Sequence, residues 1–297
     1  MEKTKLARIE YIIAMIIYGT CGIISKFITV SSGFIVFSRA VIGSITIILF
    51  LILRRRKLDI NAIKKNLLWL ILGGACIGFN WMCLFTSYNY VSVSVSSLCN
   101  YLAPALFIIV SIFLFKEKIS LFKIICILIA LVGIVLLSGI IGNNNDVNSL
   151  GVLLGIGAAL FYVGIFIFNK FIKDIDPFEK VLIEMLTVAL VTMPYAFISL
   201  DYNNPIFTLN NVLLLLLLGI IHTGIAYILY LGSMAYLSSQ SIAIFSYFEP
   251  VIAVLFSYFL LKEDLSIYGW IGGVLILSST FIYEIINAKE IKKKTKI

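Results

Sequence analysis

Residues 101–120 read YLAPALFIIVSIFLFKEKIS, and residues 247–266 read YFEPVIAVLFSYFLLKEDLS. Each stretch opens on tyrosine, has proline at its fourth position, continues as an apolar run and ends with a Lys-Glu pair before the final serine. An apolar run of this kind fits a membrane-spanning helix, which needs roughly twenty apolar residues. The two stretches therefore predict one type of membrane helix that occurs once in each half of the chain.

The similarity continues on the N-terminal side of these stretches. At the same offset of 146 residues, LGGACIGFNWMCLFTSYNYVSVS (72–94) lies over LGIIHTGIAYILYLGSMAYLSSQ (218–240). The residues that recur at their partner positions are Gly73, Gly78, Tyr90, Ser92, Tyr101, Pro104, Lys116, Glu117 and Ser120. Chance matches between apolar helices do not produce such an ordered set without a gap. We predict two repeats as the domains of the chain, residues 1–146 and residues 147–297.

Composition places the whole chain in the membrane. The chain has 297 residues, of which 61% are hydrophobic and 13% charged, and its mean hydropathy is +1.09. A soluble domain of this length needs far more polar surface. We predict an all-α integral membrane protein with ten transmembrane helices. The predicted spans are 10–30, 34–53, 67–88, 95–115, 119–141, 150–170, 178–200, 211–234, 241–261 and 266–286.

The net charge of +8 is distributed unevenly among the connections between these spans. With a cytoplasmic N-terminus, the inner segments hold Lys3, Lys5, Arg8, Arg54, Arg55, Arg56, Lys57, Lys64, Lys65, Lys116, Lys118, Lys123, Lys170, Lys173, Lys180 and the tail IKKKTK. The outer segments hold only Lys26 and Lys262. Cytoplasmic loops carry the excess of lysine and arginine in membrane proteins. We therefore predict a multi-pass protein of the cytoplasmic membrane with both termini inside, and we assign the basic charge to orientation and not to nucleic-acid binding. The Ile-, Lys- and Asn-rich composition suggests a bacterial source.

Five spans per repeat have a consequence for topology. Because five is odd, the second repeat must cross the membrane in the opposite sense, which places Lys116–Glu117 inside and Lys262–Glu263 outside. Two inverted five-helix repeats are typical of secondary transporters, which hold their substrate near the membrane midplane between the repeats and work by alternating access. The sequence therefore favours a carrier over an enzyme or a scaffold.

These features resemble the drug/metabolite transporter superfamily, specifically its EamA-type members. The fourth helix of each repeat in that family is similar to residues 101–120, the second copy often has Glu-Pro as at Glu249–Pro250, and Arg39 matches an arginine common in the second helix. The chain departs from the family at Tyr18–Gly19, where Trp-Gly is frequent. The resemblance implies a ten-helix fold, a central cavity lined largely by helices 3, 4, 8 and 9 with 1 and 6, and export of amino acids or related metabolites.

Charged residues inside predicted spans are candidate site residues, because a charge in hydrocarbon costs several kcal/mol unless it is paired or faces water. Glu249 stands beside Pro250 in span nine, where it is able to bind a cationic substrate, exchange a proton or serve as a structural hydrogen-bonded carboxyl. Arg39 either meets a substrate carboxylate or extends towards the membrane interface, and Glu184 has the same interfacial interpretation. Their corresponding positions in inverted repeats argue against a direct pair.

Polar and aromatic residues within the spans complete the candidate substrate site. His222, the only histidine, is interpreted as a proton relay or as a partner in an interhelical hydrogen bond. Aromatic faces attract alkylammonium groups, although tyrosine and tryptophan also collect at membrane interfaces. The predicted set is Asn80, Trp81, Asn100, Tyr101, Tyr227, Tyr230 and Tyr247, in addition to Glu249, Arg39 and His222.

Several motifs are absent from the sequence. It has no G-x-x-x-x-G-K-[ST] loop, no H-E-x-x-H, no G-x-S-x-G, and no Cys/His cluster with metal spacing. We therefore expect no enzyme activity, cofactor or metal, and we expect a small-molecule substrate, a lipid bilayer as the environment, and transport driven by protons or by the substrate's own gradient. The alternatives are an organic-cation carrier and a non-transporting sensor or scaffold. The oligomeric state has no signal in the sequence.

Overall fold

The computed structural model describes residues 2–115, 121–137, 148–200, 208–237, 239–246 and 248–294. In that part of the chain every regular element is a helix. The elements are α1 (Glu2–Ser25), α2 (Ser32–Leu53), α3 (Ile60–Ser87), α4 (Val93–Asn100), α5 (Ala103–Phe115), α6 (Leu121–Leu137), α7 (Ser149–Asn169), α8 (Pro177–Ile198), α9 (Leu209–Leu216), η1 (Leu217–Ile225), α10 (Ala226–Met234), α11 (Ser239–Ser246), α12 (Phe248–Leu261) and α13 (Ile267–Lys294). The all-helical prediction is confirmed.

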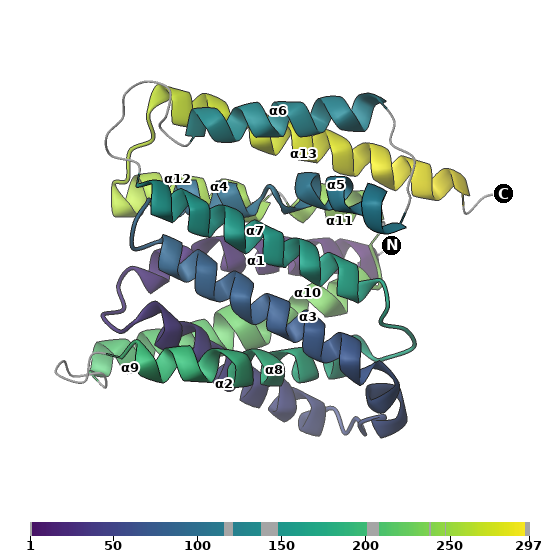
Figure 1. Cartoon of the computed structure of the whole chain (residues 1–297). Helices are drawn as coiled ribbons and strands as arrows, with labels where there is room; N and C mark the ends of the chain where they lie inside the picture. Colours follow the sequence, from purple (N-terminus) through teal and green to yellow (C-terminus); the bar gives the residue numbers. More distant parts are fainter. Residues whose placement is uncertain are drawn as a thin grey trace.

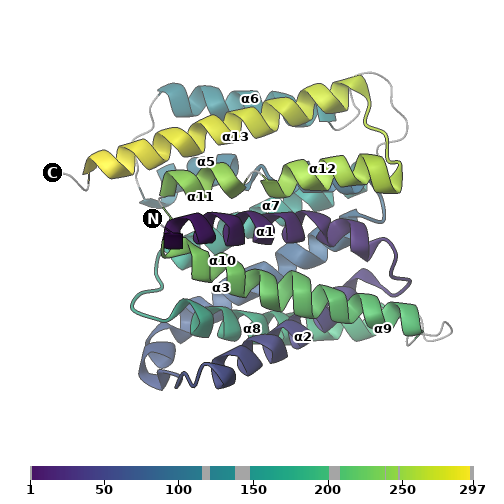
Figure 2. The same ribbon diagram turned by 180° about the vertical axis from the view of Figure 1, so that it is seen from behind.

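The helices lie roughly parallel or antiparallel to one another in stacked layers (Figure 1). The start of α1 and the end of α13 lie at the same end of the bundle in both views (Figures 1 and 2). We call this end the terminal face and the other end the opposite face. The helix α6 packs on α13 at one edge, and α2, α8 and α9 lie at the other edge.

Within the described residues, six segments are long and apolar enough to cross a membrane, and they are Lys3–Ser25, Ser32–Leu53, Ile60–Ser87, Ser149–Asn169, Pro177–Ile198 and Leu209–Met234. Shorter apolar helices occur at Val93–Phe107, Ile124–Gly133, Phe248–Leu261 and Ile267–Ser279. Large apolar side chains also point outward, and Leu53, Phe113 and Ile198 are each at least 80% exposed. A surface of this kind suits lipid because hydrocarbon, unlike water, solvates it.

The predicted span 95–115 is divided in the structure into α4 and α5, with a break at Tyr101–Leu102. Proline explains this break, since its ring removes a backbone donor and clashes with the carbonyl four residues earlier. The carbonyl four residues before Pro104 belongs to Asn100, the last residue of α4. In the second repeat, the predicted span 241–261 contains α11, which ends at Ser246, and α12, which begins at Phe248, and residue 247 lies outside the described residues. Pro250 stands in α12 at the position that corresponds to Pro104.

The range 211–234 is one long segment with a π-helical centre, η1, which the apolar pattern did not predict. The π-helical centre packs closely against α2. A Cβ atom on Gly219 would lie 2.3 Å from Ile42 Cβ, and one on Gly224 would lie 2.4 Å from Thr46 Cγ2. The contact is reciprocal, because a Cβ on Gly43 of α2 would lie 2.4 Å from Thr223 Cγ2. These glycines permit the backbones of α2 and η1 to approach closely.

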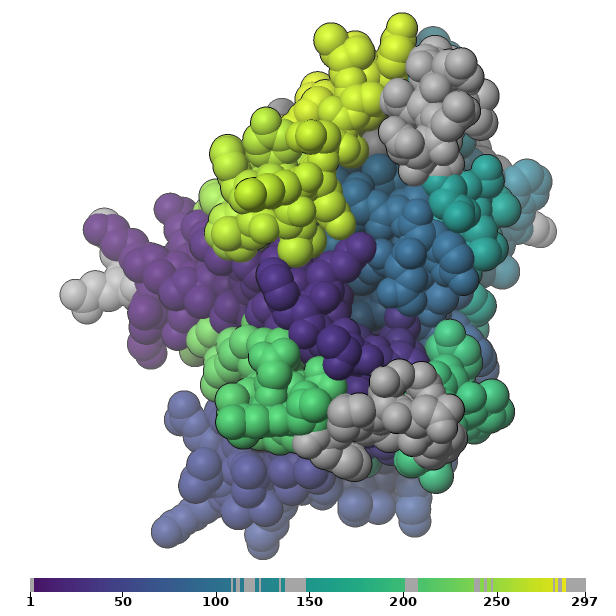
Figure 3. Space-filling model, turned by 90° about the vertical axis from the view of Figure 1, so that its left-hand side faces the viewer, coloured from purple at the N-terminus to yellow at the C-terminus, as the bar shows by residue number. Residues whose placement is uncertain are grey.

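The connection between α1 and α2 holds the opposite face together. Lys26 forms an ion pair with Glu263 at 3.4 Å and donates a hydrogen bond to the Tyr88 carbonyl at 2.5 Å. Thr29 donates its backbone N–H to Asn211 Oδ1 at 3.1 Å. Figure 3 looks at this face and shows the purple α1–α2 residues in its middle, between residues of both halves of the chain.

A second set of contacts joins the α2–α3 and α7–α8 connections at the terminal face. Arg56 pairs with Asp176, and the backbone N–H of Asp59 donates to Glu179 Oε1 at 2.9 Å. Asn66 exchanges two hydrogen bonds with the backbone of Lys173, at 2.8 and 3.0 Å. Both faces are thus closed in part by contacts between the two halves.

Candidate functional site

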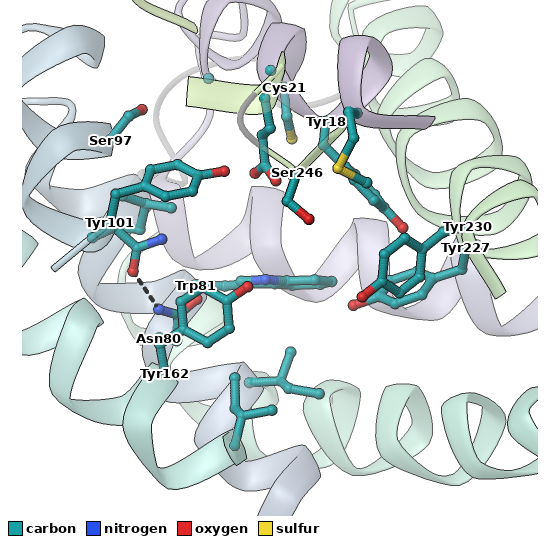
Figure 4. Close-up of a pocket in the computed structure, with 18 of the residues that line it drawn as sticks. Tyr18, Cys21, Asn80, Trp81, Ser97, Tyr101, Tyr162, Tyr227, Tyr230 and Ser246 are labelled. Atoms are coloured by element: carbon teal, nitrogen blue, oxygen red, sulfur yellow. Dashed lines mark hydrogen bonds between the residues drawn. The ribbon is translucent and has the colours of Figure 1, made fainter. Parts of the chain in front are cut away.

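A cavity of about 410 Å³ lies between the two halves of the bundle. Its walls come from α1, α2, α3, α4, α7, α8, α10, α11 and α12, and from the break between α4 and α5. The family resemblance implied spans 1, 3, 4, 6, 8 and 9 as the walls. The structure adds the second span, which is α2, and the seventh span, which is α8. Of the tyrosines that the structure describes, six line the cavity: Tyr18, Tyr88, Tyr101, Tyr162, Tyr227 and Tyr230. Figure 4 shows several of them pointing into a common space together with Trp81 and Asn80.

The structure brings together most of the residues that the sequence singled out. Those that line the cavity are Arg39, Asn80, Trp81, Asn100, Tyr101, Tyr227, Tyr230 and Glu249. Tyr247 lies outside the described residues. His222 is described and does not line the cavity. The break between α4 and α5 explains part of this gathering, because it lies at Tyr101, directly after Asn100.

Arg39 is buried inside the protein, with 4% of its surface exposed, so it does not extend to a membrane interface. Its guanidinium carbon stacks 3.8 Å from the centre of the Trp81 ring. The Nε–H donates to Thr223 Oγ1 at 3.1 Å and Nη1 donates to Cys21 Sγ at 3.2 Å. A guanidinium carries five N–H donors. Among the described residues, no carboxylate lies within ion-pair distance of it, which leaves donors that face the cavity for a ligand.

Glu249 occupies the first turn of α12, which begins at Phe248. It lines the same cavity as Arg39 and accepts a hydrogen bond from the hydroxyl of Tyr101, which lies at the break between α4 and α5. Close packing of α1 fixes this turn, since a Cβ on Gly19 would lie 2.6 Å from the Glu249 carbonyl oxygen. The Tyr101–Glu249 contact thus joins the α4–α5 break to α12, across the interface between the repeats.

Asn80 organises the neighbouring wall. Its Nδ2 donates to Asn100 Oδ1 at 2.8 Å and to the Ala158 carbonyl at 2.7 Å, which links α3 to α4 and α7 (Figure 4). Both asparagines are less than 9% exposed. Buried amides that are fully paired hold helices in a fixed arrangement, because breaking one leaves a polar group unsatisfied.

His222, which the sequence grouped with the substrate site, is not among the residues that line the cavity. The residue is buried, and its Nε2 lies 3.0 Å from Thr20 Oγ1 while Nδ1 lies 3.3 Å from the Leu217 carbonyl. Both ring nitrogens therefore have protein partners. The π-helical turn directs the ring towards α1 and away from the cavity, so the interhelical hydrogen bond is the interpretation that the structure supports.

Several lining residues were outside the predicted set. Tyr18, Tyr162, Asn169, Lys180 and Glu184 all line the cavity. Glu184 is 3% exposed and thus buried in the protein, contrary to the interfacial interpretation. Three of these side chains carry a buried oxygen without a hydrogen-bond partner: Tyr18 Oη, Asn169 Oδ1 and Glu184 Oε1. In the sequence these residues stand out only as polar residues within apolar spans. That pattern does not reveal which face of its helix each residue occupies.

Among the described residues, the cavity is lined by equal numbers of basic and acidic side chains. Two are basic, Arg39 and Lys180, and two are acidic, Glu184 and Glu249. In the described part of the chain no group of three or more His, Cys, Asp or Glu side chains is arranged to hold a metal ion. The arrangement suits a small solute that carries both signs of charge, or polar groups of both kinds, and an apolar part for the aromatic walls.

A helical bundle with membrane-length apolar helices and a cavity with polar and aromatic walls between two related halves defines a polytopic membrane protein of the transporter class. The sequence profile of the EamA-like transporter family matches the chain twice, over residues 8–139 and 149–284. The chain therefore belongs to the EamA-like transporter family and is a multi-pass membrane protein built from two repeats.

Individual relatives agree with this assignment. The chain is 26% identical over 283 residues to the uncharacterized transporter YxxF of Bacillus subtilis, covering 93% of this chain and 89% of that protein. It is 25% identical over 247 residues to the uncharacterized transporter YoaV of the same organism, covering 82% and 84%. A solved structure shares the fold with a TM-score of 0.63 at 17% identity, covering 92% of this chain and 95% of the other.

Proposed function

We propose that this protein is a secondary transporter that moves a small dipolar metabolite across the cytoplasmic membrane by alternating access. The preferred function is export of an amino acid or a related metabolite, and the protein is not an enzyme. Membership of a transporter family supports the class. The main support for the substrate class is the presence of Arg39 and Glu249 in the walls of one cavity.

The proposed topology has ten transmembrane helices in two inverted repeats, residues 1–146 and 147–297, with both termini in the cytoplasm. Opposite helix directions support the inversion. Helix α1 begins at the terminal face, whereas α7 begins at the opposite face, where a Cβ on Gly151 would contact Val91 and Tyr90. The terminal face is then cytoplasmic, in keeping with Arg54, Arg55, Arg56 and Lys57 at its α2–α3 connection.

Charge complementarity supports a dipolar solute. A substrate carboxylate is able to meet the remaining donors of Arg39, with the guanidinium held in place by Trp81. A substrate amino group is able to meet Glu249, whose carboxylate Tyr101 orients. The balanced charges of the cavity disfavour a solute with a net charge, because such a solute would leave a buried charge without a partner.

An organic-cation carrier is the second candidate, favoured by the aromatic groups near Glu249. Tyr18 and Tyr227 have ring centres 5.8 Å apart in an edge-on arrangement, and Tyr227 and Tyr230 lie 6.5 Å apart. Such rings can surround an alkylammonium group. In this case Glu249 is the only counter-charge needed, and Arg39 has no role in recognition.

Glu249→Gln separates the two candidates. We expect amino acids to raise the thermal unfolding midpoint of the detergent-purified protein, and the variant to weaken but keep this effect because Arg39 still binds the carboxylate. Organic amines without a carboxylate should give no stabilisation of either protein. Both expectations are checked by measuring the thermal unfolding midpoint of the two proteins with amino acids, organic amines, nucleosides and sugar phosphates. Stabilisation by amines that disappears in Glu249→Gln would instead establish the organic-cation carrier.

A further inference from the structure

A second buried carboxyl group lies in the wall of the cavity, on α8 and away from the break between α4 and α5. Glu184 on α8 is 3% exposed and lines the cavity, yet its Oε1 makes no hydrogen bond. It stands seven residues after Pro177, the first residue of α8, which places it about 10 Å from the terminal face at about 1.5 Å per residue. A buried hydrogen-bond acceptor without a donor is energetically costly, so Glu184 Oε1 is a candidate binding point for a ligand.

The only cation near Glu184 in the described residues is Lys180, one helical turn towards the terminal face. Its Nζ lies 3.8 Å from Glu184 Oε1, which is within ion-pair range and too long for a hydrogen bond. The Lys180 side chain is 25% exposed. A long side chain with access to solvent can move away from a weak ion pair. Glu184 then has no cationic partner in its low-dielectric surroundings.

Among the described residues, the helices around Glu184 leave space for the carboxyl group and donate no hydrogen bond to its Oε1. Gly73 of α3 faces it, and a Cβ there would lie 3.2 Å from Glu184 Oε1. A Cβ on Gly74 would lie 2.8 Å from the Glu184 carbonyl oxygen, so α3 and α8 are in close contact at this point. The titratable groups from the other packed elements are Tyr227 of α10, which interacts electrostatically with Glu184, and Arg39 of α2 in the same cavity.

We propose that Glu184 is a proton-binding site, separate from the substrate groups Arg39 and Glu249, and that Lys180 is its exchangeable counter-cation. When Lys180 turns into the water at the terminal face, a hydronium ion donates its proton to Oε1, an O–H bond forms, and water is released. When Lys180 returns, the proton leaves to water. In the transporter proposed above, this exchange couples substrate movement to protons, and that part of the inference rests on the proposed function.

Infrared difference spectroscopy of the detergent-purified protein between acidic and alkaline pH tests the site with the proton itself as the probe. We expect a carbonyl stretch of a protonated carboxyl group that is lost in Glu184→Gln. Glu179→Gln is the matched control, because Glu179 is a buried glutamate of the same helix whose Oε2 also has no hydrogen-bond partner, but it does not line the cavity and its Oε1 accepts a hydrogen bond from the Asp59 N–H, which glutamine can retain. Its spectrum should keep the band. Superimposable spectra of the unmodified protein and Glu184→Gln would overturn the proposal.

A conservative variant keeps the experiment decisive if Glu184→Gln fails to fold. In Glu184→Asp the carboxyl group is retained in a changed position, so the same band should move in frequency. A band that stays in place in Glu184→Asp would mean that another group produces it, which overturns the assignment to Glu184.

Proteoliposomes test the coupling. With an equimolar mixture of radiolabelled proteinogenic amino acids, an imposed proton gradient should drive accumulation by the unmodified protein and by Glu179→Gln, and accumulation should be lost in Glu184→Gln. If Glu184→Gln also loses amino-acid binding in thermal shift, Glu184 binds the substrate's amino group and the proton assignment is overturned. If no protein transports any amino acid, the proposed function fails, while the infrared spectra still decide whether Glu184 binds a proton.

Discussion

Arg39→Gln is expected to lose about 2–5 kcal/mol of amino-acid binding, roughly a 30- to 5,000-fold weaker affinity. The loss is large because the guanidinium is buried and stacked on Trp81, so water does not replace its donors when it is removed. Titration of thermal stability with the amino acid that stabilises the unmodified protein best measures the change.

Two further variants serve as controls for this result. Arg54→Gln removes an exposed arginine at the end of the same helix and should leave affinity unchanged. Arg39→Lys keeps the charge but not the planar fork or its stacking, so its affinity should fall between the other two. Equal affinities of Arg39→Gln and the unmodified protein would remove Arg39 from substrate recognition.

Gly219→Ala is expected to be the most damaging small substitution for stability. The new methyl group would lie 2.3 Å from Ile42 Cβ and 2.5 Å from Ile42 Cγ2, so α2 and η1 must move apart. Overpacking of this kind costs about 1–3 kcal/mol. We expect the thermal unfolding midpoint to fall by several degrees. Arg39 lies one turn before Ile42 and bonds to Thr223 of η1, so amino-acid binding should weaken as well.

Gly232→Ala is the matched control, because no atom lies within 4 Å of its added Cβ. Alanine is favoured over glycine inside a helix by about 1 kcal/mol, so this variant should unfold at the same temperature or higher. If Gly219→Ala and Gly232→Ala unfold at the same temperature, close packing of α2 on η1 does not limit stability.

The sequence was sufficient for the helical class and the two-repeat organisation. Apolarity and length identify helices directly, and the recurrence of Tyr101, Pro104 and the Lys-Glu pair reveals the repeat. The same Pro104 predicts where the span 95–115 is interrupted, but a continuous apolar pattern obscured the break after Asn100. The π-helix η1 was out of reach because its apolar residues have no distinct period.

The candidate site was predictable in its chemistry and not in its geometry. Polar and aromatic residues inside spans identified Arg39, Glu249 and Asn80 as candidates, and all three line one cavity. The sequence did not reveal which way each helix turns its polar face. For that reason His222 was grouped with the cavity although it bonds to Thr20, and Glu184 was assigned to an interface although it is buried.

Counterflow in proteoliposomes tests the central claim most directly. Vesicles that contain the purified protein are loaded with an unlabelled amino acid and diluted into the same amino acid in labelled form. The proposed transporter predicts saturable uptake of label that exceeds uptake by protein-free vesicles and is abolished by Arg39→Gln. Uptake equal to that of protein-free vesicles for every amino acid and amine tested would contradict a carrier function for this cavity.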